Sequence, residues 1–148
     1  MIAMTLLSIL ATISFSILYQ VPKKAIIPIG VVGMVAWLSY SISLQFSHNV
    51  VLASFIGSLI ASLLSEAFAR FIHMPVVLFA VPGIVVLLPG LLAYSAMKAF
   101  VSHQYMTGIS MATQTALVAG ALASGIAMSG IVAKAIWRKY RVSTPPVR

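Results

Sequence analysis

The sequence contains no cysteine, and Glu66 is its only acidic residue. Without cysteine the chain has no disulfide framework, no thiolate nucleophile and no thiolate metal site. One carboxylate side chain also leaves almost nothing for general acid–base catalysis. Charged residues make up 7% of the chain, whereas a soluble domain carries about 25%, so the composition excludes a soluble catalytic domain. We therefore expect neither an enzyme nor a bound cofactor.

Nine lysines and arginines give the chain a formal net charge of +8. On a soluble surface such a charge would suggest nucleic-acid binding. Here the basic residues stand at the ends of apolar segments, so membrane topology explains the charge better, and we expect no nucleic-acid partner. The three histidines also fall at segment ends, on two different sides of the predicted membrane, so we expect no metal site. They are His48, His73 and His103.

Hydrophobic residues make up 61% of the chain and gather in five stretches. A helix needs roughly 20 apolar residues to cross a bilayer, and each stretch is long enough. We predict an all-α membrane protein with one domain at residues 1–141 and a cytoplasmic tail at residues 142–148. The first stretch lacks the features of a signal peptide, so we expect it to be retained. The predicted spans are Ile2–Val21, Ala25–Phe46, Val50–Ile72, Pro75–Phe100 and Ala112–Trp137, with a break at Ser102–Ser110 before the last.

The distribution of basic residues predicts the orientation, because lysine and arginine near span ends are retained in the cytoplasm. If all five segments cross and the N-terminus is outside, eight of the nine basic residues are cytoplasmic and only Lys98 is outside. If the fourth segment instead returned to the side from which it entered, five basic residues would be cytoplasmic and four would be outside. We therefore expect the N-terminus outside, the C-terminus inside and the chain in the cell membrane. The eight are Lys23, Lys24, Arg70, Lys134, Arg138, Lys139, Arg141 and Arg148.

Two Pro-Gly steps lie seven residues apart in the fourth segment, Pro82-Gly83 and Pro89-Gly90. Each proline lacks a backbone donor and clashes with the preceding helical turn, so we predict a span broken by both steps. Such breaks are tolerated in a membrane where they pack on protein or line a wet cavity, and broken helices often form transport sites. A kinked helix that only packs is the alternative.

The same breaks define the predicted substrate pathway. The carbonyls of Leu78 and Val85, four residues before the two prolines, are expected to lose their helical partners. Tyr94 and Ser95 follow Gly90 by about one turn and add hydroxyl groups that could face the same cavity. These residues and the two Pro-Gly steps form the predicted pathway, to which Glu66 is added below.

Small residues recur at helical spacing in the third and fifth segments, which predicts close helix packing within the chain or with a partner. In the third segment a polar ridge lies beside the small one. The small ridge comprises Ala53, Gly57, Ala61, Ser65 and Ala69, and the polar ridge Ser54, Ser58, Ser62, Glu66 and Arg70. The fifth segment has Ala121, Gly125, Ser129 and Ala133, with Ala116, Gly120 and Ser124 one face over.

Glu66 has two interpretations, because an ionisable residue within a membrane span is a functional candidate by default. Arg70 follows it by four residues, in the orientation that favours a helical ion pair. A structural pair near the cytoplasmic interface is one interpretation, and a part in proton or substrate handling is the other. The sequence leaves both open.

Several motifs occur in a fixed order over most of the chain. They are Val21-Pro22-Lys23-Lys24-Ala25, then Gly30 and Gly33, Met74-Pro75, Val81-Pro82-Gly83-Ile84, Leu87-Leu88-Pro89-Gly90, and finally Tyr94 and Met97. The Pro-Gly-x-x-x-Tyr run from Pro89 to Tyr94 is the most specific of them. In order and spacing the set resembles the small integral-membrane half of the threonine/serine exporter family.

This resemblance implies the small subunit of a two-chain exporter, joined to a larger membrane subunit in a hetero-oligomer within the lipid bilayer. It implies export of a small carboxylate, either threonine and serine or a dicarboxylate such as succinate, coupled to the proton gradient. The lone Glu66 agrees with an incomplete carrier, since proton-coupled carriers generally use several membrane carboxylates or histidines. Two other hypotheses remain: an accessory subunit that only stabilises a partner, and a self-sufficient small drug-efflux dimer.

Overall fold

The computed structural model describes residues 2–141, with side chains from residue 3 to residue 135, and every regular element in this part is a helix. The predicted all-α class is therefore confirmed, while the predicted tail at 142–148 lies outside the described residues. The elements are α1 (Ile2–Leu18), α2 (Lys23–Ser47), α3 (Val50–Ile72), α4 (Val77–Ile84), the 3-10 turn η1 (Val85–Leu87), α5 (Gly90–Val101) and α6 (Tyr105–Arg141).

The three histidines lie at helix C-termini. His48 and His73 are the C-cap residues of α2 and α3, and His103 follows the cap residue of α5; all three have positive φ. A non-glycine residue in this left-handed conformation lets the chain leave the helix sharply. At the other end of the α2–α3 turn, the Asn49 side chain accepts the amide hydrogen of Val51 at 2.9 Å and so caps the start of α3. These caps explain why two long apolar helices follow each other with so short a connection.

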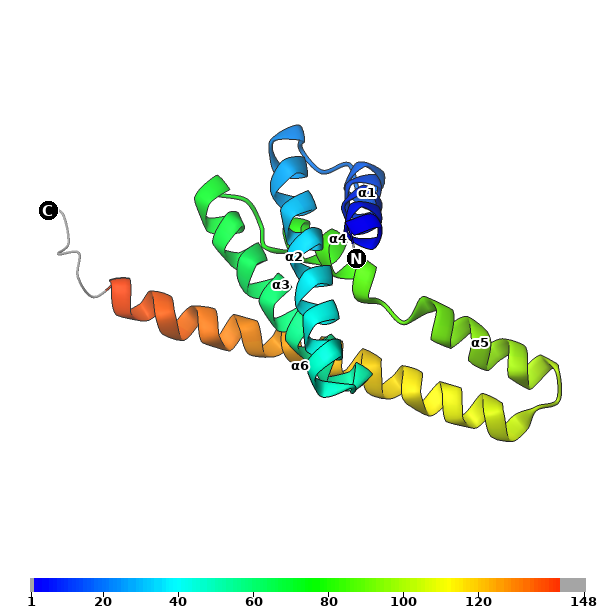
Figure 1. Ribbon diagram of the computed structural model, residues 1–148. Helices are drawn as coiled ribbons and strands as arrows, with labels where there is room; N and C mark the ends of the chain where they lie inside the picture. The colour runs from blue at the N-terminus through cyan, green and yellow to red at the C-terminus, as the bar shows by residue number, and fades with distance from the viewer. Residues whose placement is uncertain (1, 142–148) are drawn as a thin grey trace, which may run out of the picture.

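The helices form a body and a projecting hairpin (Figure 1). In the body, α2 contacts α1, α3 and α4, and α4 also contacts α3. The long helix α6 contacts α3 with its middle and C-terminal parts, while its N-terminal part pairs with α5 away from α1 and α4. The main apolar core lies where α2, α3, the end of α4, η1 and α6 meet. It contains Val32, Ala36, Ala61, Ile84, Leu87, Val118 and Leu122.

Hydroxyl groups line the buried face of α1, a pattern not noted in the sequence. Ser8, Thr12 and Ser16 are all buried and recur every four residues. The Thr12 hydroxyl donates to the Ser8 carbonyl at 2.7 Å, and the Ser16 hydroxyl donates to the Thr12 carbonyl at 2.8 Å. Because each hydroxyl is satisfied within its own helix, this face can pack on α2, where Thr12 lies against Gly33.

Three described helices are long and apolar enough to cross a membrane: α2, α3 and the Tyr105–Ala135 part of α6. The pair formed by α4 with η1 and by α5 is bent by 52° and gives either a broken span or a re-entrant loop. Helix α1 is apolar but shorter, at 17 residues. The structure thus has three to four candidate spans by length and composition, compared with the five predicted.

The start of the last helix was predicted wrongly. The sequence suggested a break from Ser102 to Ser110, but α6 already begins at Tyr105 and the connection is only three residues long. Packing explains the difference: the Phe100 ring on α5 lies over Gly108, where a Cβ atom would be 3.0 Å from the ring. Gly108 therefore allows the first turns of α6 to pack closely on α5, despite the polar residues that suggested a loop.

Candidate functional site

The two Pro-Gly steps have different structures. Pro82 and Gly83 lie inside α4, so the first of the two expected interruptions is absent. The reason is a tertiary contact, since a Cβ atom on Gly83 would overlap the Val32 side chain of α2. Helix α4 ends at Ile84 and continues as the 3-10 turn η1 to Leu87; the helical path is interrupted at the second step, where Leu88 is extended (φ −63°, ψ 135°) and α5 begins at Gly90. A residue before proline is driven toward this extended conformation.

The two residues whose carbonyls the prolines were expected to free, Leu78 and Val85, lie in different surroundings. The Val85 carbonyl is not free, because it accepts the Leu88 amide hydrogen at 3.2 Å within the 3-10 turn. This corrects the expectation for Val85. Leu78 and Pro82 instead border a small hollow of about 140 Å³ between the α1–α2 connection and α4. The hollow is almost wholly apolar, and its remaining lining residues are Tyr19, Val21, Val77 and Val81.

A larger pocket, of about 320 Å³, lies at the helix break itself. Its polar side chains come from other helices: Trp37 and Tyr40 from α2, and Ser54 from α3. The Trp37 and Tyr40 rings are 5.7 Å apart, and the Ser54 hydroxyl donates to the Val50 carbonyl at 2.8 Å, which leaves its oxygen free to accept. The full lining is Trp37, Tyr40, Val50, Ser54, Val86, Leu87, Leu88, Pro89, Leu91, Leu92 and Val118.

The first turn of α5 lines this pocket with Leu91 and Leu92. The Gly90 amide donates to the Leu88 carbonyl at 2.8 Å, and the Ala93 amide donates to the Pro89 carbonyl at 3.0 Å. The two amides between them, of Leu91 and Leu92, have no intrahelical acceptor because they belong to the first turn, and Pro89 gives no side-chain cap. A helix N-terminus carries partial positive charge, so the pocket wall suits a carboxylate.

The predicted pathway residues are not brought together in one cavity. Of the two Pro-Gly steps, only Pro89 lines the pocket at the break; Gly90 is exposed with no atom within 4 Å of a Cβ position. Tyr94 is 65% exposed on α5 and lines none of the hollows described here, and Ser95 is half-buried one residue later. The hydroxyl groups at the break therefore come from α2 and α3, not from α5.

Trp37 and Tyr40 are residues that the sequence analysis missed. They lie three positions apart in a long apolar run, so they are neighbours on one face of α2. Two aromatic side chains with polar groups on one face of an apolar segment indicate a binding pocket only weakly. Nothing in that segment indicates that α5, which begins fifty residues after Tyr40, starts beside them.

Small residues make close contacts between α3 and its neighbours. A Cβ atom on Gly125 of α6 would lie 2.8 Å from the Phe55 carbonyl oxygen, and one on Gly57 would lie 3.2 Å from Leu87 and Tyr40. Ala53, Ala61 and Ser129, also among the predicted packing residues, are buried. Gly120 is exposed, and no atom lies within 4 Å of its Cβ position, so any close packing at Gly120 involves another chain.

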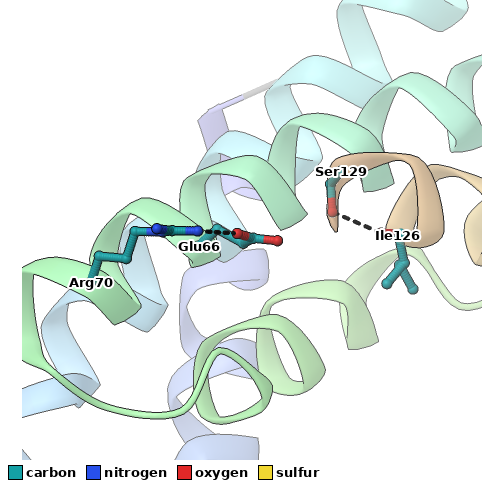
Figure 2. Close-up of polar contacts among 4 residues, drawn as sticks. All are labelled: Glu66, Arg70, Ile126 and Ser129. Carbon is teal, nitrogen blue, oxygen red and sulfur yellow. Dashed lines mark hydrogen bonds and ion pairs between the residues drawn. The ribbon is translucent and has the colours of Figure 1, made fainter. Parts of the chain in front are cut away.

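Glu66 lies in the seam between α3 and α6, which we define by Ser58, Ser62 and Glu66 on α3 and by Gly125, Ser129 and Gly130 on α6. One carboxylate oxygen, Oε2, is 3.4 Å from Nη2 of Arg70. The Glu66 side chain is 14% exposed and that of Arg70 is 40% exposed. Figure 2 shows the carboxylate directed from α3 toward the turn of α6 that carries Ser129. The other oxygen, Oε1, lies 3.8 Å from the Cβ position of Gly130.

A family model described as "Threonine/Serine exporter, ThrE" matches residues 4–132. Both the pocket at the break and the seam between α3 and α6 lie within the matched residues. No solved structure matches the chain.

Proposed function

Because the chain belongs to the threonine/serine exporter family, we propose that it is the small subunit of a two-component exporter for a small carboxylate. Family membership and the long apolar helices make it a multi-pass cell-membrane protein of the exporter kind. The finer features are proposals: the substrate is a dicarboxylate such as succinate, or threonine and serine, and transport is coupled to the proton gradient.

The pocket at the break is the observation that supports a role in transport. Discontinuous membrane helices point the N-terminus of a half-helix at anionic groups of substrates in many transporters. Here Leu91 and Leu92, whose amides belong to the first turn of α5 and lack intrahelical acceptors, line the pocket together with Tyr40 and Ser54, which carry hydroxyl groups. A volume of about 320 Å³ is near the lower end for ligand pockets, at roughly 300 Å³, which fits a small metabolite.

For the topology we propose five crossings, with the N-terminus outside and the C-terminus in the cytoplasm. Helix α1 would be a short first span, since its 17 residues extend about 26 Å against a hydrocarbon core of about 30 Å. The bent pair of α4 and α5 would be the fourth span. This arrangement keeps eight of nine basic residues inside. A phosphatase reporter fused at the C-terminus should be inactive, and an active fusion would contradict the proposal.

We propose a larger membrane subunit as the partner. This chain brings only one carboxylate side chain, so a proton-coupled route through the complex needs others. The exposed faces of the α5–α6 hairpin, including the open position beside Gly120, are available for such a contact. Purification in mild detergent should recover a second, larger membrane protein. Recovery of a homo-oligomer that transports unaided would contradict this part of the proposal.

Paired tyrosine variants test the pocket. Tyr40→Phe removes a hydroxyl group that borders the pocket, so we expect a several-fold loss of succinate or threonine export. Tyr94→Phe removes the same group from an exposed position of α5 and serves as the matched control, with export close to that of the parent. Export is measured from inverted membrane vesicles with labelled substrates, at equal amounts of protein in the membrane. Equal rates for the two variants would contradict a transport role for this pocket.

The second candidate function is an accessory subunit that stabilises a partner without lining the path. The exposed position of Gly120 favours it, because no atom of this chain lies within 4 Å of its Cβ position and a helix of another chain can approach closely there. Both functions predict that Gly120→Leu, at the exposed small position of α6, weakens the complex. Only the accessory role predicts that Tyr40→Phe leaves export unchanged in an intact complex.

A further inference from the structure

The seam between α3 and α6 holds a polar side chain without a partner. Ser62 is 2% exposed, and its hydroxyl oxygen Oγ has no hydrogen-bond partner among the described residues. The buried serines on either side, Ser58 and Ser65, donate to carbonyls of their own helix. An unsatisfied buried hydroxyl costs about 1–3 kcal/mol, so Ser62 is an exception that calls for an explanation.

Glu66 lies one turn after Ser62 on the same face of α3, so their side chains are neighbours. Its ion pair with Arg70 is loose, because 3.4 Å exceeds the roughly 2.7–2.9 Å of a charge-assisted hydrogen bond. Oxygen Oε1 faces the α6 backbone at Gly130, a residue with no side chain to fill the space. The seam thus contains a mostly buried carboxylate and, one turn before it, an orphan hydroxyl.

Other charged groups around the seam are all cationic. Besides Arg70, the described ones on helices that pack against α3 are Lys134 on α6 and Lys23 and Lys24 on α2, and these three are exposed. Helix α4 has no titratable side chain, and His73 at the end of α3 is exposed. No described acid competes with Glu66 for a proton in this region.

We propose that Glu66 is a proton-binding site of the exporter and that Ser62 is the hydrogen-bond partner of its protonated form; this rests on the proposed function. One proton adds to a carboxylate oxygen and forms an O–H bond, and no other covalent bond changes. The carboxyl charge goes from −1 to zero, so Arg70 loses the Glu66 counter-ion. The new O–H group then donates to Ser62 Oγ in the seam. Release of the proton restores the carboxylate and the pair with Arg70.

Two modes of transport separate proton binding from a structural role. Substrate exchange across vesicles needs no net proton movement, whereas accumulation driven by a pH gradient does. We expect Glu66→Gln to keep exchange and to lower gradient-driven accumulation about tenfold or more, since Gln cannot take up the proton. Arg70→Gln is the matched control, because it breaks the same ion pair from the other side and keeps the carboxylate. It should retain gradient-driven accumulation.

The outcomes distinguish this site from the exporter function itself. If parent vesicles exchange neither succinate nor threonine, the proposed function fails and the coupling role fails with it. If the parent exchanges substrate and Glu66→Gln still accumulates it in response to the gradient, the proton site alone is wrong. Identical losses in Glu66→Gln and Arg70→Gln would show a merely structural pair.

A spectroscopic test of Ser62 does not depend on transport. Because Glu66 is the only acidic side chain, the infrared carbonyl stretch of its protonated form can be isolated by subtracting the Glu66→Gln spectrum of the full chain in liposomes. Ser62→Ala should shift this band, since it removes the hydrogen-bond partner, and should lower gradient-driven accumulation by about tenfold or less. An unchanged band in Ser62→Ala would contradict the proposed contact.

Discussion

Pro82-Gly83 and Pro89-Gly90 are the same dipeptide in one apolar segment, yet the first lies within α4, which passes into the 3-10 turn η1, and the helical path is interrupted at the second. Their surroundings differ. Gly83 is buried against Val32 of α2, in a position where a Cβ atom would not fit, whereas Gly90 is exposed and has open space around it. Tertiary packing thus holds the first step in a helix that its proline opposes, and no comparable contact holds the second.

The comparison shows that a proline sets a local tendency and that the neighbouring helix decides the outcome. Proline in a helix interior costs about 3 kcal/mol, a penalty that burial of α4 against α2 and α3 can offset. At Pro89 the tendency prevails, and the break that results frees the first amides of α5 beside a pocket. One dipeptide therefore serves packing at one position and shapes a binding surface at the other.

The largest expected effect comes from filling the space at the first step. Gly83→Ala places a methyl group against Val32, so we expect a loss of about 1–3 kcal/mol in stability. Thermal unfolding of the purified chain in detergent measures it. If Gly83→Ala is as stable as the parent, packing of α4 on α2 does not explain the intact helix.

A second substitution serves as control for this clash. Val32→Ala shortens the side chain that the new methyl group meets, so the double variant Gly83→Ala, Val32→Ala should recover part of the loss despite the smaller core. Coupling between the two positions in a double-mutant cycle would be about 0.5–3 kcal/mol if they share one contact. If the stability changes of the two single variants simply add in the double variant, the destabilisation does not come from a contact between positions 83 and 32.

Removing the second break should impair transport more than stability. Pro89→Ala supplies an amide donor and lets α4 and α5 approach one continuous helix, which reduces the 52° bend and withdraws the amides from the pocket. We expect export to fall about tenfold, equivalent to ~1.4 kcal/mol. Pro82→Ala is the matched control and should keep its export rate per folded molecule, because the helix already continues through Pro82.

The bend itself can be measured in the same variants. Since the chain has no native cysteine, two exposed positions on either side of the break, Val77 and Val101, can be changed to cysteine and spin-labelled without removing any other thiol. The distance between the labels should increase in Pro89→Ala. An unchanged distance together with reduced export would show that the bend is not the cause.

The smallest effect is expected at Gly90. Its φ is not positive and nothing lies within 4 Å of its Cβ position, so alanine fits the existing backbone. Gly90→Ala should stabilise the chain by ~0.4–1 kcal/mol, because the unfolded chain loses conformational freedom. Thermal unfolding beside Gly83→Ala gives the comparison, in which the two Gly→Ala changes should have opposite signs. A destabilised Gly90→Ala would contradict the open surroundings of this glycine.

Several features of the fold follow from the sequence because they depend on local composition. The third span was predicted at Val50–Ile72, and α3 has these bounds. Its small ridge, from Ala53 to Ala69, is buried, as the four-residue spacing indicated. Apolar length and helical periodicity are properties of a single segment, so a single segment suffices to predict them.

The site could not be predicted to the same extent, because it depends on contacts between distant segments. The sequence does not distinguish Pro82 from Pro89, since the difference lies in the contact of Gly83 with Val32. Tyr40 has no local feature that marks it as a pocket residue, and Tyr94, which has such a feature, is exposed. Local patterns predict that the segment has a break, and tertiary structure determines where it lies.

Helix α6 runs without interruption for 37 residues, about 55 Å, past both the pocket and the seam. Val118 borders the pocket, and Gly125 meets α3 at the seam only seven residues, or about 10 Å, farther along the same rod. A stiff helix cannot slide or roll at one of these points without doing so at the other. Any displacement that repacks Gly125 against α3 therefore changes the shape of the pocket wall, and by thermodynamic reciprocity occupancy of the pocket changes the energy of that repacking.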